Sequence, residues 1–113
     1  MPHSIVEYSH SVEKQIDPEI LLATVHQTIS KSPLFGVNDV STRSMRYTHY
    51  RLGSKKAGFI HVTVRLFQGR SDRDKAELTR QIGEAVEAMG LIDTQISCEC
   101  VDIHLPSIYR SKV

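Results

Sequence analysis

The spacing of apolar positions predicts a strand, a helix and a weaker strand in the first half of the chain. Residues 4–9 are rich in strand-forming side chains, so the chain opens into a β-strand almost at once. Residues 17–19 (Asp-Pro-Glu) supply an N-cap, a proline in the first helical position and an acid in the first turn, which together predict a helix start. The Ser-Pro pair at 32–33 ends this helix. Its buried face, spaced at the helical period, consists of Ile20, Leu21, Thr24, Val25, Thr28 and Ile29.

The second half of the chain carries a clearer strand, helix and strand. Residues 34–54 form a weaker region in which turn-forming side chains precede a strand somewhere within residues 41–52. A strand is predicted over 59–67, and residues 71–74 (Ser-Asp-Arg-Asp) resemble a capping box that opens a helix. A last strand is predicted over 96–105. The apolar stripe of the helix and its closing glycine are Leu78, Ile82, Val86, Met89 and Gly90.

This order of elements predicts two tandem βαβ units, at about 2–52 and 58–105, within one domain over residues 1–113. In each unit the second strand returns parallel to the first through the helix. The fold class is therefore α+β, with a mixed four-stranded sheet and two helices on one face. Because the strand at 59–67 is apolar in places on both of its faces, we expect its other face to pack against a second sheet in an oligomer.

Charge and composition exclude several classes of function. The chain has 14 Lys and Arg against 13 Asp and Glu, so it lacks the excess of positive charge that draws nucleic acid or an anionic membrane. No apolar run approaches the roughly 20 residues needed to cross a bilayer, and no secretory pattern opens the chain. We therefore expect a cytoplasmic protein with neither nucleic acid nor membrane as a partner.

The cysteines and histidines show no metal-binding pattern. Cys98 and Cys100 lie two residues apart in a predicted strand, where both side chains point to one face and are poorly placed to form a disulfide. Two buried thiols are expected. None of the six histidines has the spacing of a metal ligand, and His3 and His61 fall at similar points of the two units, so packing or interface roles are expected for both.

Pro2 is the candidate catalytic group. If Met1 is removed, as happens readily before a small residue, Pro2 carries the only secondary amine of the chain, on a rigid ring at the start of a strand. Burial in an apolar pocket would disfavour the protonated amine and lower its pKa toward neutrality, which suits a general base. Nearby arginines would act in the same direction. A penultimate proline is common, however, and is weak evidence by itself.

Several stretches of the sequence resemble a known family. Residues 1–9 (Met-Pro-His-Ser-Ile-Val-Glu-Tyr-Ser), 50–51 (Tyr-Arg) and 59–62 (Phe-Ile-His-Val) resemble the opening and the middle of 5-carboxymethyl-2-hydroxymuconate isomerases. Residues 69–72 (Gly-Arg-Ser-Asp) and the helix through Val86 resemble the small 4-oxalocrotonate tautomerases, of which this family is a two-unit version. Together the matches cover most of the chain.

The resemblance implies the tautomerase fold, a homotrimer of pseudo-sixfold symmetry, no cofactor and Pro2 as general base. It implies a C=C-transposing or keto–enol isomerase that moves a proton in an unsaturated 2-hydroxy or 2-keto dicarboxylic acid, such as 5-carboxymethyl-2-hydroxymuconate. Arg70 matches the family arginine that binds a substrate carboxylate. Its position beside a helix N-terminus, where an anion is favoured, agrees with that role. The alternative is a loop arginine that is exposed to solvent and binds no substrate.

The resemblance also implies a further substrate-binding arginine in this region, but Ser41 aligns with one candidate for it. Either Arg43 or Arg46 takes over that contact, or the protein handles a different substrate. The alternative for Arg43, Arg46 and Arg51 is an ion-paired role at a subunit interface.

Two other functions remain open. A hydratase or dehalogenase of the same superfamily would need an acid near Pro2, for which Glu7 is the candidate. A non-catalytic trimeric binding module is favoured if Met1 is retained, because the acylated Pro2 nitrogen is then no base.

Overall fold

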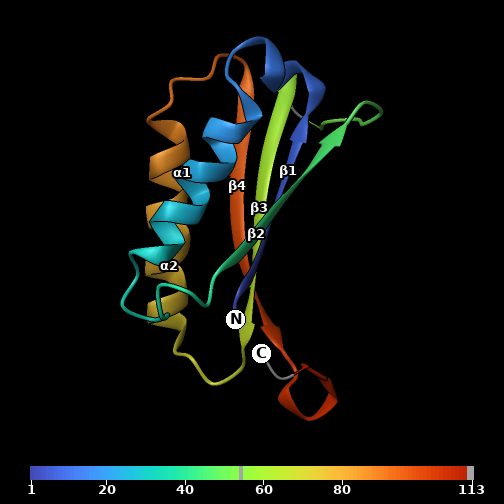
Figure 1. The fold of residues 1–113 in the computed structure, drawn as a ribbon. Helices are drawn as coiled ribbons and strands as arrows, with labels where there is room; N and C mark the ends of the chain where they lie inside the picture. The colour runs from blue at the N-terminus through green and yellow to red at the C-terminus, as the bar shows by residue number, and fades with distance from the viewer. Residues whose placement is uncertain (54, 112–113) are drawn as a thin grey trace.

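The computed structural model describes residues 1–53 and 55–111, so Ser54 and residues 112–113 of the predicted domain lie outside the described residues. Within that part the chain forms four strands and two α-helices (Figure 1). The elements are β1 (His3–Ser9), the 3-10 helix η1 (His10–Lys14), α1 (Pro18–Ser30), β2 (Ser41–Tyr47), β3 (Gly58–Phe67), α2 (Asp72–Glu87), β4 (Thr94–Ile103) and the 3-10 turn η2 (Leu105–Ser107).

The strands form one mixed sheet in the order β2-β1-β3-β4. β1 runs parallel to β2 and β3 runs parallel to β4, whereas the two central strands β1 and β3 are antiparallel. Each half of the chain is therefore a parallel strand–helix–strand segment, and the antiparallel centre joins the two halves. The predicted fold class, with two helices on one face of a mixed sheet, is confirmed.

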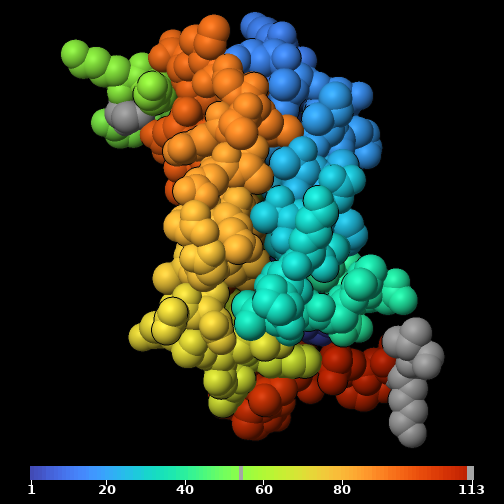
Figure 2. Space-filling view, turned by 90° about the vertical axis from the view of Figure 1, so that its left-hand side faces the viewer, coloured from blue at the N-terminus to red at the C-terminus, as the bar shows by residue number. Residues whose placement is uncertain are grey.

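The hydrophobic core lies between the sheet and the helices. Figure 1 shows α1 and α2 on the same side of the sheet, and Figure 2 shows them side by side. Every second residue of β3 points into this layer, and each fully buried Val, Leu or Ile contributes about 1.5–3 kcal/mol. The fully buried aliphatic residues of the helices and β3 are Leu21, Val25, Ile29, Leu78, Ile82, Val86, Ile60, Val62, Val64 and Leu66.

Side-chain caps explain where the helices begin. The Asp17 carboxylate accepts a hydrogen bond from the Glu19 backbone N–H at 2.9 Å, and the Ser71 hydroxyl accepts one from Asp74 N–H at 3.1 Å. Gly90 follows α2 with a φ of 71°, a conformation that glycine adopts without strain. Both predicted helix starts are confirmed. The 3-10 helix η1 was not predicted.

Three predicted details are wrong. Ile20 is 55% exposed, because the buried face of α1 is the narrower stripe at Leu21 and every fourth residue after it. Cys98 and Cys100 face the helices but are only half-buried, since β4 is an edge strand. The last strand ends at Ile103 instead of 105, because the 3-10 turn η2 begins at Leu105. The second strand, Ser41–Tyr47, lies within the range predicted for it.

The face of the sheet opposite the helices has no cover among the described residues. Alternation along the strands places Ile5, Phe59 and Phe67 on this open face, where they remain partly exposed. No helix in the described ranges is long and apolar enough to cross a membrane.

Candidate active site at the proline end

Pro2 lies at one end of the sheet and is buried. Its carbonyl accepts a hydrogen bond from the Ser41 backbone N–H at 3.0 Å, which ties it to the start of β2. Because His3 pairs with Arg65, the antiparallel register continued by one residue places Pro2 beside Leu66 near the end of β3. Figure 1 shows that the N-terminus, the loop 68–71 and the segment after β4 lie together, and we call this the proline end.

A pocket of about 950 Å³ opens at the proline end. Three stretches of the chain line it: the N-terminus, the loop between α1 and β2, and the segment after β4. Met1 is part of the lining and is bonded directly to the nitrogen of the buried proline. The lining residues are Met1, His3, Asn38, Asp39, Ser41, Ile108, Tyr109, Arg110 and Ser111.

Positive charge dominates the open face beside Pro2. The pKa of His3 is lowered from its usual 6.5, first by burial of the ring and then by the charges of Arg43, the N-terminal amine and Arg65. His3 is therefore mainly neutral at pH 7. The same charges disfavour any further cation at this point of the sheet.

Arg70 lies at the proline end but outside the lining of this pocket. Its guanidinium carbon lies 4.8 Å from the centroid of the Phe35 ring, a cation–π contact, and its Nε is buried with no hydrogen-bond partner among the described residues. The helix N-terminus beside it already carries Asp72 and Asp74 in the first turn of α2, so it offers an anion less than the sequence suggested. Arg70 itself still has hydrogen-bonding capacity.

The structure separates Arg43 from Arg46. Arg43 pairs in register with Ile5 on the open face, close enough to His3 to lower the pKa of that ring. Arg46, three residues later, points to the helix face and forms an ion pair with Glu13 of η1. Of these two arginines, therefore, only Arg43 lies on the open face, near the end of the sheet where His3 borders the pocket.

The carboxylate that the sequence suggests near Pro2 is not the one that lines the pocket. Glu7 lies five residues along β1 from Pro2, about 16 Å at the strand rise, and accepts a hydrogen bond from the Tyr47 hydroxyl. This bond is the main reason that the pKa of Tyr47 is raised. Asp39, in the loop before β2, is the acid that lines the pocket. It lies within residues 34–54, where the pattern predicts only a turn.

A second hollow, of about 440 Å³, lies at the opposite end of the sheet, near Glu7 and residues 47–52. Tyr47 and Tyr50 both pack against Phe59; their ring centroids lie 5.7 Å and 5.4 Å, respectively, from the centroid of the Phe59 ring. His61 contacts Ser97 and Glu99 on the open face, each at 2.6 Å. No group of three or more potential metal ligands occurs among residues 1–53 and 55–111.

Two parallel strand–helix–strand segments around an antiparallel centre, with helices on one face and a proline at the first strand, define the class of tautomerase-fold proteins. Residues 2–95 match the profile of the 5-carboxymethyl-2-hydroxymuconate isomerase family, and the chain belongs to that family. Family membership supports an isomerase.

Solved structures show the same fold. A 5-carboxymethyl-2-hydroxymuconate isomerase from Deinococcus radiodurans R1 is similar with a TM-score of 0.82 at 20% identity, over 99% of this chain and 90% of that chain. A 5-carboxymethyl-2-hydroxymuconate delta-isomerase gives 0.78 at 15% identity, over 100% and 88%. A "Q0 fused 4-OT wild type symmetric trimer" gives 0.68 at 19% identity, over 89% and 85%. No curated protein matches the sequence.

Proposed function

We propose that the protein is a C=C-transposing or keto–enol isomerase in which Pro2, freed by removal of Met1, is the general base. The substrate class is an unsaturated 2-hydroxy or 2-keto acid with two or more carboxylates, such as 5-carboxymethyl-2-hydroxymuconate. One observation carries the proposal: Pro2 is buried immediately before β1, and both of its chain neighbours, Met1 and His3, line a pocket of about 950 Å³. Membership in an isomerase family supports it.

The surroundings of Pro2 suit a base that is neutral near pH 7. The proline is buried, and Arg43 and Arg65 act electrostatically on His3, the next residue. Burial and positive charge both disfavour a protonated amine, so the pKa of the freed Pro2 nitrogen is expected to lie below that of a free secondary amine. Such a base accepts a proton from a dienol or an allylic carbon and returns it at another carbon.

The arginines supply the complementary charge. Arg70 lies at the proline end outside the pocket lining, and its Nε has no partner in the described structure, so we propose that its guanidinium binds a substrate carboxylate. Negative charge that develops on the carbonyl oxygen during proton transfer requires a fixed donor, and Arg43 is the candidate on the open face. Because Arg46 is paired with Glu13 on the other face, we leave it out of the proposed site.

A homotrimer and the absence of a cofactor complete the proposal. The uncovered face of the sheet carries partly exposed apolar side chains, and burying them against other copies of the chain would remove them from water. Similar structures include a symmetric trimer. Proton transfer by an amine needs no metal or organic cofactor, and a cytoplasmic location remains part of the proposal.

The first experiment combines intact mass with an ultraviolet assay of ketonisation of a 2-hydroxymuconate-type dienol. A mass without Met1 together with turnover is expected. Arg70→Ala should raise KM for a dicarboxylate while leaving kcat less affected, because it removes binding rather than the base. Retained Met1 with no turnover would favour the non-catalytic binding module instead.

Hydration is the second candidate, because Asp39 lines the same pocket as Met1. In that reaction the prolinium would act as an acid and the Asp39 carboxylate would activate water. The assay separates the two candidates: Asp39→Asn should abolish hydration but leave ketonisation by Pro2 in place.

A further inference from the structure

The segment after β4 crosses the proline end and forms one wall of the pocket. Ile108, Tyr109, Arg110 and Ser111 face the N-terminus across it. Figure 2 shows this segment, in red, at the same end as the loop that precedes β2, in cyan and green. The wall opposite the base is thus built from a part of the chain outside the strand–helix–strand segments.

Several contacts fix the course of this segment. The Gln68 side-chain oxygen accepts a hydrogen bond from Leu105 N–H at 3.1 Å, which ties η2 to the loop after β3. The His104 ring Nδ1 lies 2.9 Å from the Ser107 hydroxyl, and Ser107 N–H donates to the His104 carbonyl at 3.1 Å. The turn is therefore held at both its start and its end.

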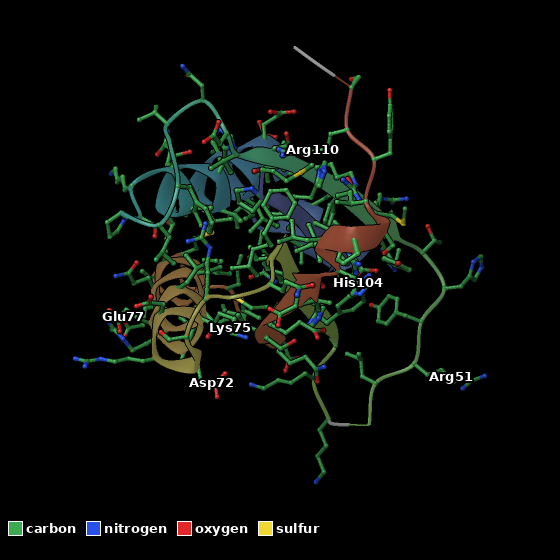
Figure 3. The ribbon with its side chains drawn as sticks, turned by 90° about the horizontal axis from the view of Figure 1, so that it is seen from below. Arg51, Asp72, Lys75, Glu77, His104 and Arg110 are labelled. Carbon is green, nitrogen blue, oxygen red and sulfur yellow. The ribbon has the colours of Figure 1, made fainter. Side chains whose placement is uncertain are left out.

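Arg110 is held over an aromatic ring. Its guanidinium carbon lies 4.7 Å from the centroid of the Phe67 ring at the end of β3, and no ion pair joins Arg110 to a carboxylate of the described residues. Stacking leaves the edge of a guanidinium free to donate to an anion. Figure 3 views the molecule from this end and shows Arg110 far from the acidic side chains Asp72 and Glu77 of α2.

We propose that Arg110 binds the second carboxylate of a dicarboxylic substrate and so sets the preference of the site for diacids over monoacids. The proposal rests on the proposed function for the position of the reacting carbons. It gives Arg110 a role in specificity and assigns Phe67 as the residue that positions its guanidinium. Asp39, the one carboxylate among the lining residues, weakens this anion site.

Binding of two matched acids tests the proposal without turnover. Muconate is a six-carbon diene with a carboxylate at each end, and sorbate is the same diene with one. Titration calorimetry on the Met1-free protein should show tighter binding of muconate, and Arg110→Ala should reduce that preference about tenfold. Arg110→Lys should keep part of it, because lysine retains the charge but not the planar stack.

Arg51→Ala is the matched control, an exposed arginine near the other end of the sheet, and it should leave the preference unchanged. An unaltered muconate-to-sorbate ratio in Arg110→Ala, or no preference in the unchanged protein, overturns the proposal. Failure of the proposed function has another signature: muconate binds with the expected preference, yet the dienol is not ketonised.

Discussion

The two ends of the sheet are built from equivalent strand–helix–strand segments but differ in what they leave open. At the proline end, β1 starts behind a pocket that Met1 lines. At the opposite end, β3 starts at Gly58, which is buried beneath η1. A Cβ added at Gly58 would lie 2.7 Å from the Ser9 hydroxyl oxygen and would also crowd that of Ser11.

The difference shows why only one end is suited to proline chemistry. The backbone nitrogen of Gly58 is an amide whose lone pair is delocalised into the peptide carbonyl, so it is not a base; its N–H donates to the Asp93 carbonyl at 3.0 Å. The nitrogen of Pro2 becomes an amine once Met1 is removed. The two ends of the sheet therefore have similar backbone architecture, but only the proline end carries a residue that we propose as a base.

The largest effect on the rate of ketonisation is expected when the Pro2 amine is blocked by a retained Met1. Pro2→Leu places a bulky residue after Met1, so the methionine should be retained and ketonisation should fall about a hundredfold to ten-thousandfold, the usual contribution of a general base. Pro2→Ala is the matched control, because it allows removal of Met1 and leaves a primary amine with partial activity. Intact mass and initial rates check both variants. Full activity of a protein that retains Met1 would refute the proposal that Pro2 is the general base.

A substitution at the buried Gly58, at the opposite end of the sheet, should change the free energy of unfolding more than the rate of ketonisation. Gly58→Ala forces the side chains of Ser9, at the end of β1, and Ser11, in η1, to move, at a cost of about 1–3 kcal/mol. Gly83→Ala is the control, since nothing lies within 4 Å of a Cβ there and the helix should gain about 0.5–1 kcal/mol. Thermal unfolding at one fixed protein concentration measures both. Equal shifts would mean that Gly58 is not tightly packed.

A smaller effect concerns the charges at the proline end. Removing the positive charge of Arg43 should raise the pKa of His3, so Arg43→Gln should move the NMR titration midpoint of His3 upward. Arg46→Gln, on the other face, should leave that midpoint in place. If both variants shift it alike, the two arginines are not separated by the sheet.

The same lowered pKa makes stability depend on pH. The unfolded His3 binds its proton near its usual pKa of 6.5, above the folded pKa, so the unfolded state takes up the proton first as the pH falls. His3 therefore contributes a loss of stability that begins near pH 6.5 and is complete below its folded pKa. His3→Gln should flatten the fall in melting temperature over that window.

Local patterns predicted the elements well where capping and periodicity agreed. Asp17 and Ser71 start the helices as expected, and the stripe at Leu78, Ile82 and Val86 is buried. Prediction was poorer where burial is partial: β2 consists largely of exposed polar residues, so its extent was uncertain. For the site, the sequence pointed to Pro2 and Arg70 but missed Asp39 and Arg110, which belong to segments without a periodic pattern.

The sequence by itself determined the order of the elements, the fold class and the place of a proline before the first strand, because these depend on neighbouring residues and on periods of two and 3.6. Only the tertiary structure decided which charges meet. Arg43 and Arg46 are three residues apart yet lie on opposite faces, whereas Arg110 reaches Phe67 from more than forty positions along the chain. Strand register and the turns of the chain determine which of these side chains come together, and both depend on contacts between residues that are distant in the sequence.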